Sequence, residues 1–256
     1  MAASRPGGNR IAELRGVAHK CLALVAGKEM LARVVDTLKA TPSIGRIFVS
    51  IENDAVLQRS PLLAEMQARG DFNTIPSGPN IAQSVANALD RVPDPWPLLI
   101  TTADNALHFP ELIDSFCCNA LLHDADAVFA VTRAETVLAK YPDGHRAFHK
   151  LRGGAYSGCN MYALLNPDAA RAVRAFSTGG QFAKNPARMI GAFGLLSFLL
   201  WRLRVLDLAQ IMRRLSRVLG IRLEAGMVDF AEGPIDVDKG RDLELVERIL
   251  TAREAA

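Results

Sequence analysis

Apolar residues in this chain gather in short compact runs, separated by stretches in which they recur every three or four positions. Residues 46–51 are rich in β-branched and aromatic side chains, and residues 127–132 form a similar run. Both predict strands. Between residues 30 and 38, apolar residues are spaced as on one face of a helix, which predicts an amphipathic helix after a turn at Gly27. The alternation of the two patterns organises the rest of the chain.

The run at residues 97–100 ends in Thr101-Thr102-Ala103-Asp104-Asn105. Its length predicts a buried strand of a parallel sheet, although periodicity alone does not exclude a helical segment. In open α/β sheets, ligands bind beyond the carboxyl ends of the strands, so Asp104 is a candidate functional residue. The alternative is that Asp104 only caps a helix that begins near Pro110.

Composition limits the class of protein. The 256 residues allow one large α/β domain or two small ones, and with 50% hydrophobic and 22% charged residues the chain is globular. A net charge of +3 does not by itself indicate nucleic-acid binding. The four cysteines match no zinc pattern, and the polar N-terminus has no apolar signal-peptide segment. Reduced thiols in a cytoplasmic protein are the simplest interpretation.

Two polar loops are candidate ligand-binding segments. Residues 2–10 are rich in Gly and contain Arg5, and such a loop near a helix start can hold phosphates; the alternative is a loosely ordered terminus. Residues 73–80 lead into a helix that ends near Leu89, and Asn80 could be simply its N-cap. The spacing of Ile81, Val85 and Leu89 predicts core packing, which leaves Ser77, Asn80, Gln83 and Ser84 on the polar face.

The N-terminal motifs resemble a known family. Residues 2–5, Lys20-Cys21-Leu22 and Gly27-Lys28-Glu29-Met30-Leu31 are similar to the signature loop of nucleotidyltransferases with a GT-A-like fold, such as molybdenum-cofactor guanylyltransferases. The resemblance implies a three-layer α/β/α fold with a mixed, mostly parallel sheet, as one NTP transferase domain over residues 1–256. It also implies that Arg5 and Lys20 neutralise the NTP phosphates.

The same resemblance assigns further sites. It places Ala2, Ala3, Ser4, Gly7 and Gly8 on the phosphates, and Ser77, Gly78, Asn80 and Ser84 on the base and ribose. The final Pro234-Ile235-Asp236-Val237-Asp238 resembles the family's closing motif. Asp104, Asp238 and the alternate Asp236 are therefore expected to hold Mg²⁺, although an Asp-x-Asp before a helix is alone usually a cap.

The acceptor side of the site resembles a family hairpin. By that resemblance, Gly158 and Asn160 contact the acceptor and Lys150 is a candidate for its phosphate. The alternative is a turn glycine with an asparagine that satisfies the local backbone.

The chain also departs from the family pattern. Ser4 replaces a glycine, Pro6 interrupts the loop, the spacing to Lys20 is long, and Lys239-Gly240-Arg241 replaces Thr-Pro-Glu. The family's first strand precedes this loop, so either a strand lies upstream of Met1 or this member lacks it. We expect the former, because a central parallel strand is costly to omit.

Residues 180–222 form an expected helical insertion. It contains the uncharged run 189–201, too short for a bilayer span of about 20 residues, flanked by many arginines. A basic amphipathic insertion can lie at a membrane interface or cover a lipid-like substrate. Peripheral membrane contact through residues 188–222 is one interpretation; a buried helical pair with solvated arginines is the other, and it is the more common arrangement for such a pattern.

Together these features predict a Mg²⁺-dependent nucleotidyltransferase. It would transfer an NMP from an NTP to a phosphorylated small-molecule or lipid-like acceptor, release pyrophosphate, and bind no nucleic acid. One alternative is a GT-A glycosyltransferase, which uses the same fold with a nucleotide-sugar donor. The other is a non-catalytic, membrane-peripheral nucleotide-binding module, favoured by Ser4 and Pro6.

Overall fold

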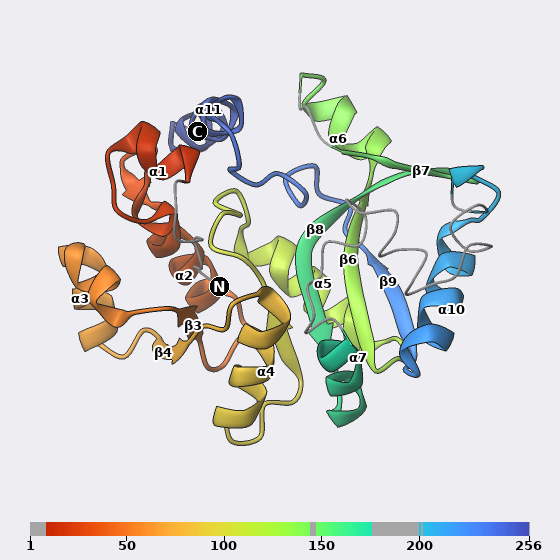
Figure 1. Ribbon diagram of the computed structural model, residues 1–256. Helices are drawn as coiled ribbons and strands as arrows, with labels where there is room; N and C mark the ends of the chain where they lie inside the picture. Colours follow the sequence, from red (N-terminus) through yellow and green to blue (C-terminus); the bar gives the residue numbers. More distant parts are fainter. Residues whose placement is uncertain (1–8, 144–146, 176–199, 201, 256) are drawn as a thin grey trace.

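The computed structural model describes residues 9–143, 147–175, 200 and 202–255 (Figure 1). Nine strands are placed within these ranges: β1 (Leu24–Val25), β2 (Lys28–Glu29), β3 (Phe48–Ile51), β4 (Asn73–Pro76), β5 (Leu98–Ile100), β6 (Ala127–Arg133), β7 (His149–Leu151), β8 (Gly154–Leu164) and β9 (Leu223–Met227). The α-helices there are α1 (Arg10–Arg15), α2 (Met30–Ala40), α3 (Pro61–Ala68), α4 (Ile81–Arg91), α5 (Pro110–Leu121), α6 (Ala134–Lys140), α7 (Ala170–Ala175), α10 (Leu208–Leu219) and α11 (Gly240–Glu254). Short 3-10 helices lie at Lys20–Leu22, Asp54–Arg59 and Pro167–Ala169.

The main sheet has the strand order β5-β8-β6-β9, with β7 paired to β8. β8 is antiparallel to both β5 and β6, whereas β9 is parallel to β6. Strands β5, β6 and β9 therefore run in one direction and β8 runs against them. β3 and β4 form a separate parallel pair. The expected α/β fold with a mixed, mostly parallel sheet is confirmed.

Helices cover both faces of the main sheet because side chains alternate along each strand. On one face, Val128 and Ala130 of β6 pack with Ile113 and Phe116 of α5. On the other face, Ala127 and Leu164 pack with residues of α4, α7 and α10. Figure 1 shows α4, α7 and α10 beside the sheet and α11 near the other end of the molecule. These are the expected three layers.

Most element predictions agree with the structure, and two differ. Ile81 is 59% exposed rather than part of the core, because it is the first residue of α4 and lies beyond the packed face. The final strand ends at Met227 instead of running from Gly226 to Phe230. The hydroxyl of Thr132 donates a hydrogen bond to the carbonyl of Val228 at 2.9 Å, and the chain leaves the β6–β9 strand pairing there.

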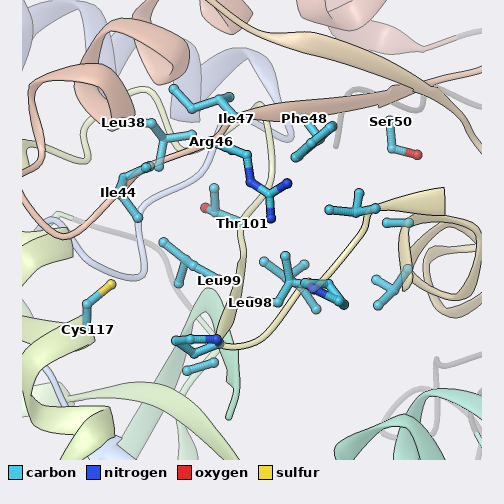
Figure 2. Close-up of a pocket in the computed structure, with 18 of the residues that line it drawn as sticks. Leu38, Ile44, Arg46, Ile47, Phe48, Ser50, Leu98, Leu99, Thr101 and Cys117 are labelled. Carbon is cyan, nitrogen blue, oxygen red and sulfur yellow. The ribbon is translucent and has the colours of Figure 1, made fainter. Parts of the chain in front are cut away.

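A cavity of about 380 Å³ lies between β3 and β5. Figure 2 shows Phe48 and Ser50 on one side of it and Leu98 and Leu99 on the other. Among the described strands, β3 pairs only with β4, and β5 pairs only with β8. The other edge of each strand pairs with no described strand and faces a largely apolar space. The expected strand upstream of Met1 remains a prediction.

The described part of the insertion is a helix whose apolar side is in use. Met212 of α10 is buried, and Leu208, Ile211, Leu215 and Leu219 pack against the cluster beside β9. This leaves α10 no broad apolar face for a membrane. No helix in the described ranges is long and apolar enough to cross a bilayer. Residues 180–199 and 201, which carry most of the apolar run, lie outside the described residues.

Candidate functional site

The centre of the site is one ammonium group held by two carboxylates. Lys20 Nζ lies 2.6 Å from Asp104 Oδ2 and 2.9 Å from Asp238 Oδ1. Although burial works against the charge, Asp104 and then Asp238 raise the pKa of Lys20. Burial likewise opposes the charge of Asp104, but Lys20 and Thr102 hold the pKa of Asp104 below its ordinary value. Lys20 and Asp104 are therefore both charged near neutral pH.

The turn after β5 orients Asp104. The hydroxyl of Thr102 donates to Asp104 Oδ1 at 2.5 Å and accepts from Asn105 Nδ2 at 2.7 Å. The N-cap of α5 is Phe109, which makes no side-chain cap bond. The capping alternative for Asp104 is therefore wrong, and its carboxylate faces Lys20 instead.

A buried histidine fixes the segment that carries Lys20. His19 Nδ1 accepts from the backbone N–H of Cys21 at 3.3 Å, which caps the 3-10 helix Lys20–Leu22. Its other ring nitrogen, Nε2, donates to Glu52 Oε1 at 3.1 Å. Burial lowers the pKa of His19, against the opposing effect of Glu52. Since Glu52 follows β3, this contact holds Lys20 at the carboxyl end of that strand.

Asp236 and Asn160 meet on the adjoining side of the site. Asn160 Nδ2 donates to Asp236 Oδ2 at 2.9 Å and lies 3.4 Å from Asn105 Oδ1. The register between β6 and β8 shifts here, so that residues 159–161 of β8 face a single residue of β6. Asn160 adopts a φ of 53° at this bulge. Bulges of this kind re-aim a side chain, and this one turns Asn160 toward the carboxylates.

The segment before α11 brings in Asp236 and Asp238. The backbone N–H of Val237 donates to the carbonyl of Asp104 at 3.0 Å, so the carboxylate-bearing segments are joined directly. The side chain that caps α11 is Asp242, whose Oδ2 accepts from Lys239 N at 2.9 Å. Neither Asp236 nor Asp238 caps the helix, and the capping alternative for this motif is wrong as well.

The loop before α4 is built around Gly78. Asn80 is the N-cap of α4, as the sequence indicated, and its Oδ1 accepts from Gln83 N at 2.9 Å. Ser84 is 1% exposed; its hydroxyl accepts from Gly78 N at 2.9 Å and donates to Asn80 O at 3.0 Å. Ser84 therefore lies behind the loop and fixes its backbone, while Ser77 and Asn80 remain partly exposed.

Some expected site residues do not join this cluster. Lys150 on β7 and Gly158 on β8 are exposed, and no described contact connects them to Asp104, Asp236 or Asp238. The expected phosphate-loop residues lie outside the described part of the chain: Ala2, Ala3, Ser4, Arg5, Gly7 and Gly8.

Two residues at the centre were not assigned a role from the sequence. Thr102 and Asn105 flank Asp104 and connect it to Asn160. The signal was present in the run Thr-Thr-Ala-Asp-Asn, in which two polar side chains stand within two positions of the carboxylate.

The donor set fits a hard divalent cation bound together with a nucleotide. Among the described residues, no three His, Cys, Asp or Glu side chains form a metal cage. Mg²⁺ does not need one, since it is usually held by one or two carboxylates, waters and substrate phosphates. The carboxylates of Asp104 and Asp238 already share one cation, the Lys20 ammonium.

Comparison with known proteins agrees with this geometry. The family model of the MobA-like NTP transferase domain matches residues 7–190, well over half of the chain. The chain belongs to the MobA-like NTP transferase family. It is accordingly an NTP-dependent transferase, and the family favours nucleotidyl transfer over the glycosyltransferase and non-catalytic alternatives. No curated relative matches it in sequence.

Solved structures share the fold of this MobA-like protein. A hypothetical transferase from Thermus thermophilus is 24% identical with a TM-score of 0.75, over 93% of this chain and 96% of that one. CMP:2-keto-3-deoxy-manno-octonic acid synthetase complexed with CTP is 14% identical with a TM-score of 0.60, over 91% and 92%. Molybdopterin-guanine dinucleotide biosynthesis protein A from Archaeoglobus fulgidus is 14% identical with a TM-score of 0.52, over 96% and 95%.

Proposed function

We propose that this protein transfers an NMP from an NTP to a phosphorylated small-molecule or lipid-like acceptor and releases pyrophosphate, with Mg²⁺ as cofactor. The observation that carries the proposal is the position of Lys20 Nζ between Asp104 and Asp238, at 2.6 and 2.9 Å. Phosphoryl transfer requires little covalent work from the protein; it requires positioned charges of both signs at one point.

The N-terminal side of the site holds the nucleotide. Lys20 neutralises the phosphates, and the resemblance assigns the same role to Arg5 of the N-terminal loop. Ser77, Gly78 and Asn80 contact the base and ribose, and Ser84 supports them through its bonds to Gly78 and Asn80. Because Lys20 is already paired with Asp104, it needs only a small side-chain rotation to reach a phosphate bound beside that carboxylate.

The carboxylates hold the metal. Asp104 is fixed by Thr102, whereas the side chain of Asp238 is 62% exposed, so that it can exchange its contact with Lys20 for the incoming cation. Asp236, held by Asn160, is the alternate ligand. Bound Mg²⁺ would supply positive charge at the phosphate oxygens as charge develops there.

The acceptor approaches from the β8 side. Asn160 is the residue of that side that contacts the carboxylates, and Lys150 and Gly158 lie on the same hairpin. In-line attack of an acceptor phosphate on the α-phosphorus forms the new P–O bond as the bond to the pyrophosphate oxygen breaks. Positioning of both partners provides most of the rate acceleration.

The deciding experiment is pyrophosphate release from each of the four NTPs in turn, with Mg²⁺ and a lysate extract that includes lipids as acceptor pool. We expect release with one NTP that depends on the extract; fractionation of the extract then identifies the acceptor. Nucleotide binding without pyrophosphate release in any combination would contradict the proposal.

A further inference from the structure

The buried carboxylate of Glu232 lies in the same chain segment as the candidate metal ligands Asp236 and Asp238 and takes no part in the proposed chemistry. It is 3% exposed, and its Oε1 accepts from Lys140 Nζ and Tyr141 Oη, both at 2.7 Å, and from Arg253 Nη2 at 3.0 Å. A carboxylate this deeply buried is stable only when it is paired and hydrogen-bonded, and the partners here come from α6, its C-terminal end and α11.

Glu232 belongs to the segment that delivers the carboxylates. We call residues 228–239 the closing segment, because it carries Asp236 and Asp238 into the site, and residues 101–109 the β5–α5 loop, because it carries Asp104. Glu232 is four positions before Asp236. The chain between them turns back on itself, with Ile235 N donating to Glu232 O at 3.0 Å.

Arg253, a partner of Glu232, also contacts the β5–α5 loop. Arg253 binds Glu232 with one nitrogen and donates from Nη1 to the carbonyl of Leu107 at 3.0 Å. Its guanidinium also stacks 5.0 Å from the ring centre of Phe109. Arg253 therefore joins the two segments through a charged contact on one side and contacts to the loop on the other.

A second link is adjacent to the first. His108 of the β5–α5 loop lies 2.9 Å through Nε2 from the carbonyl of Gly233, the residue after Glu232. His108 is buried, and burial lowers its pKa to about 4, so the neutral ring donates this bond. Gly233 has little room for a side chain, because a Cβ there would lie 3.0 Å from Cys159 Sγ.

We propose that Glu232 is a positioning residue: together with Arg253 and His108 it clamps the closing segment to the β5–α5 loop and so sets Asp236 and Asp238 against Asp104. The clamp explains why a charged group is buried where an apolar one would pack. Arg253 binds Glu232 and His108 binds Gly233, so two adjacent residues of the closing segment are held. These contacts fix the distance of the closing segment from the β5–α5 loop and its orientation. Groups behind the ligands of a metal commonly affect its affinity by about 10–100-fold.

The test uses Glu232→Gln, which keeps the shape and removes the charge that Arg253 and Lys140 need. The matched control is Asp126→Asn. Asp126 is also a buried carboxylate with a pKa of about 2, held by Arg222 and Asn166, but it precedes β6 at the other end of the sheet. Both variants should lower Tm, and only Glu232→Gln should act on the site.

The first readout is hydrogen exchange at the amide of Val237, whose N–H donates to Asp104 O across the two segments. We expect its exchange in Glu232→Gln to rise about tenfold or more beyond the change in Asp126→Asn. This measurement needs no substrate, so it decides the clamp even if the protein releases no pyrophosphate. Equal exchange in the two variants would overturn the inference.

The second readout rests on the proposed function. The Mg²⁺ concentration that gives half-maximal pyrophosphate release should rise about 10–100-fold in Glu232→Gln and stay unchanged in Asp126→Asn. If Glu232→Gln does not fold, Tyr141→Phe removes only one of the bonds to Glu232 and should show a smaller shift in both readouts. No change of either readout in a folded clamp variant would contradict the assignment of Glu232.

Discussion

Lys20 and Asp104 lie 84 positions apart in the sequence, yet the ammonium of one is 2.6 Å from Oδ2 of the other. The contact joins the 3-10 helix Lys20–Leu22, which His19 holds at the carboxyl end of β3, to the turn after β5. It also compensates two groups that burial alone would push toward their neutral forms. The pair is therefore the electrostatic centre of the site.

The first prediction concerns Asp104. Asp104→Asn should leave the fold intact and lower kcat by about a hundredfold or more, because it removes the charge that faces both Lys20 and the proposed metal. Pyrophosphate release and the circular-dichroism melt measure the two effects. Asp238→Asn, at a side chain that is 62% exposed, should have the smaller effect. Metal-dependent activity retained in Asp104→Asn would show that this residue holds no metal.

The second prediction distinguishes the backbone conformation of Asn160 from the hydrogen bond that its side-chain amide makes. Asn160 has a φ of 53°, a conformation that glycine adopts freely, so Asn160→Gly should change the free energy of unfolding by less than about 1 kcal/mol. The variant loses the 2.9 Å bond to Asp236, and we expect kcat/KM to fall about tenfold. Unfolding in denaturant and steady-state kinetics check the pair of effects. A variant that keeps full activity would leave the amide without a role.

The third prediction concerns the loop before α4. An added Cβ at Gly78 would lie 2.6 Å from Gln83 Cβ and 2.9 Å from its carbonyl carbon, so Gly78→Ala must displace the loop. We expect the KM for the NTP to rise about tenfold, at a stability cost of about 1–3 kcal/mol. The matched control is Gly45→Ala, where a Cβ meets nothing within 4 Å. Similar KM values in both variants would separate this loop from nucleotide binding.

The fourth prediction concerns acid stability. Burial works against the charge of Glu232, but its bonds from Lys140 and Tyr141 lower its pKa from 4.5 to about 2. A lowered carboxylate pKa stabilises the fold above the unfolded value and loses this effect as the pH falls toward 2. Glu232 should contribute about 3 kcal/mol that disappears over this range. Denaturant unfolding at several pH values should give a flatter profile in Glu232→Gln; parallel profiles would contradict the assignment.

The fifth prediction concerns the cavity between β3 and β5. A version of the protein with a short Val/Ile-rich strand joined before Met1 should fill this space and pair with the open strand edges. Burial of several apolar side chains should raise Tm by about 5 °C or more. The control is an extension of equal length in which Ser and Lys replace the apolar residues. Equal melting temperatures would show that the space does not accept a strand.

The elements that follow from local pattern were predictable from the sequence. The apolar runs that became β3, β5 and β6 are strands, and the helical spacing from Met30 gives α2. The sequence assigned Lys20, Asp104 and Asp238 to one site, and their side chains lie in contact because they follow or precede elements whose ends lie at one edge of the sheet. Their roles remain a prediction.

What could not be predicted depends on contacts between distant segments. Periodicity assigns Ile81 to an apolar face but does not say where the partner surface ends, and the side chain is 59% exposed. The bulge that aims Asn160 arises from the register between β6 and β8, which one strand's sequence does not contain. The pairing of Glu232 with Arg253 needs the packing of α11 against the closing segment.

The edges of β3 and β5 that pair with no described strand have a consequence for how the protein behaves in concentrated solution. An unpaired strand edge lined by apolar side chains is a template for association with another chain, which natural proteins usually block with charges or bulges. The charged side chain of Arg46 lines this space and donates hydrogen bonds to the carbonyls of Pro93 and Asp94. We therefore expect self-association to increase with protein concentration, unless another segment or a partner covers these edges.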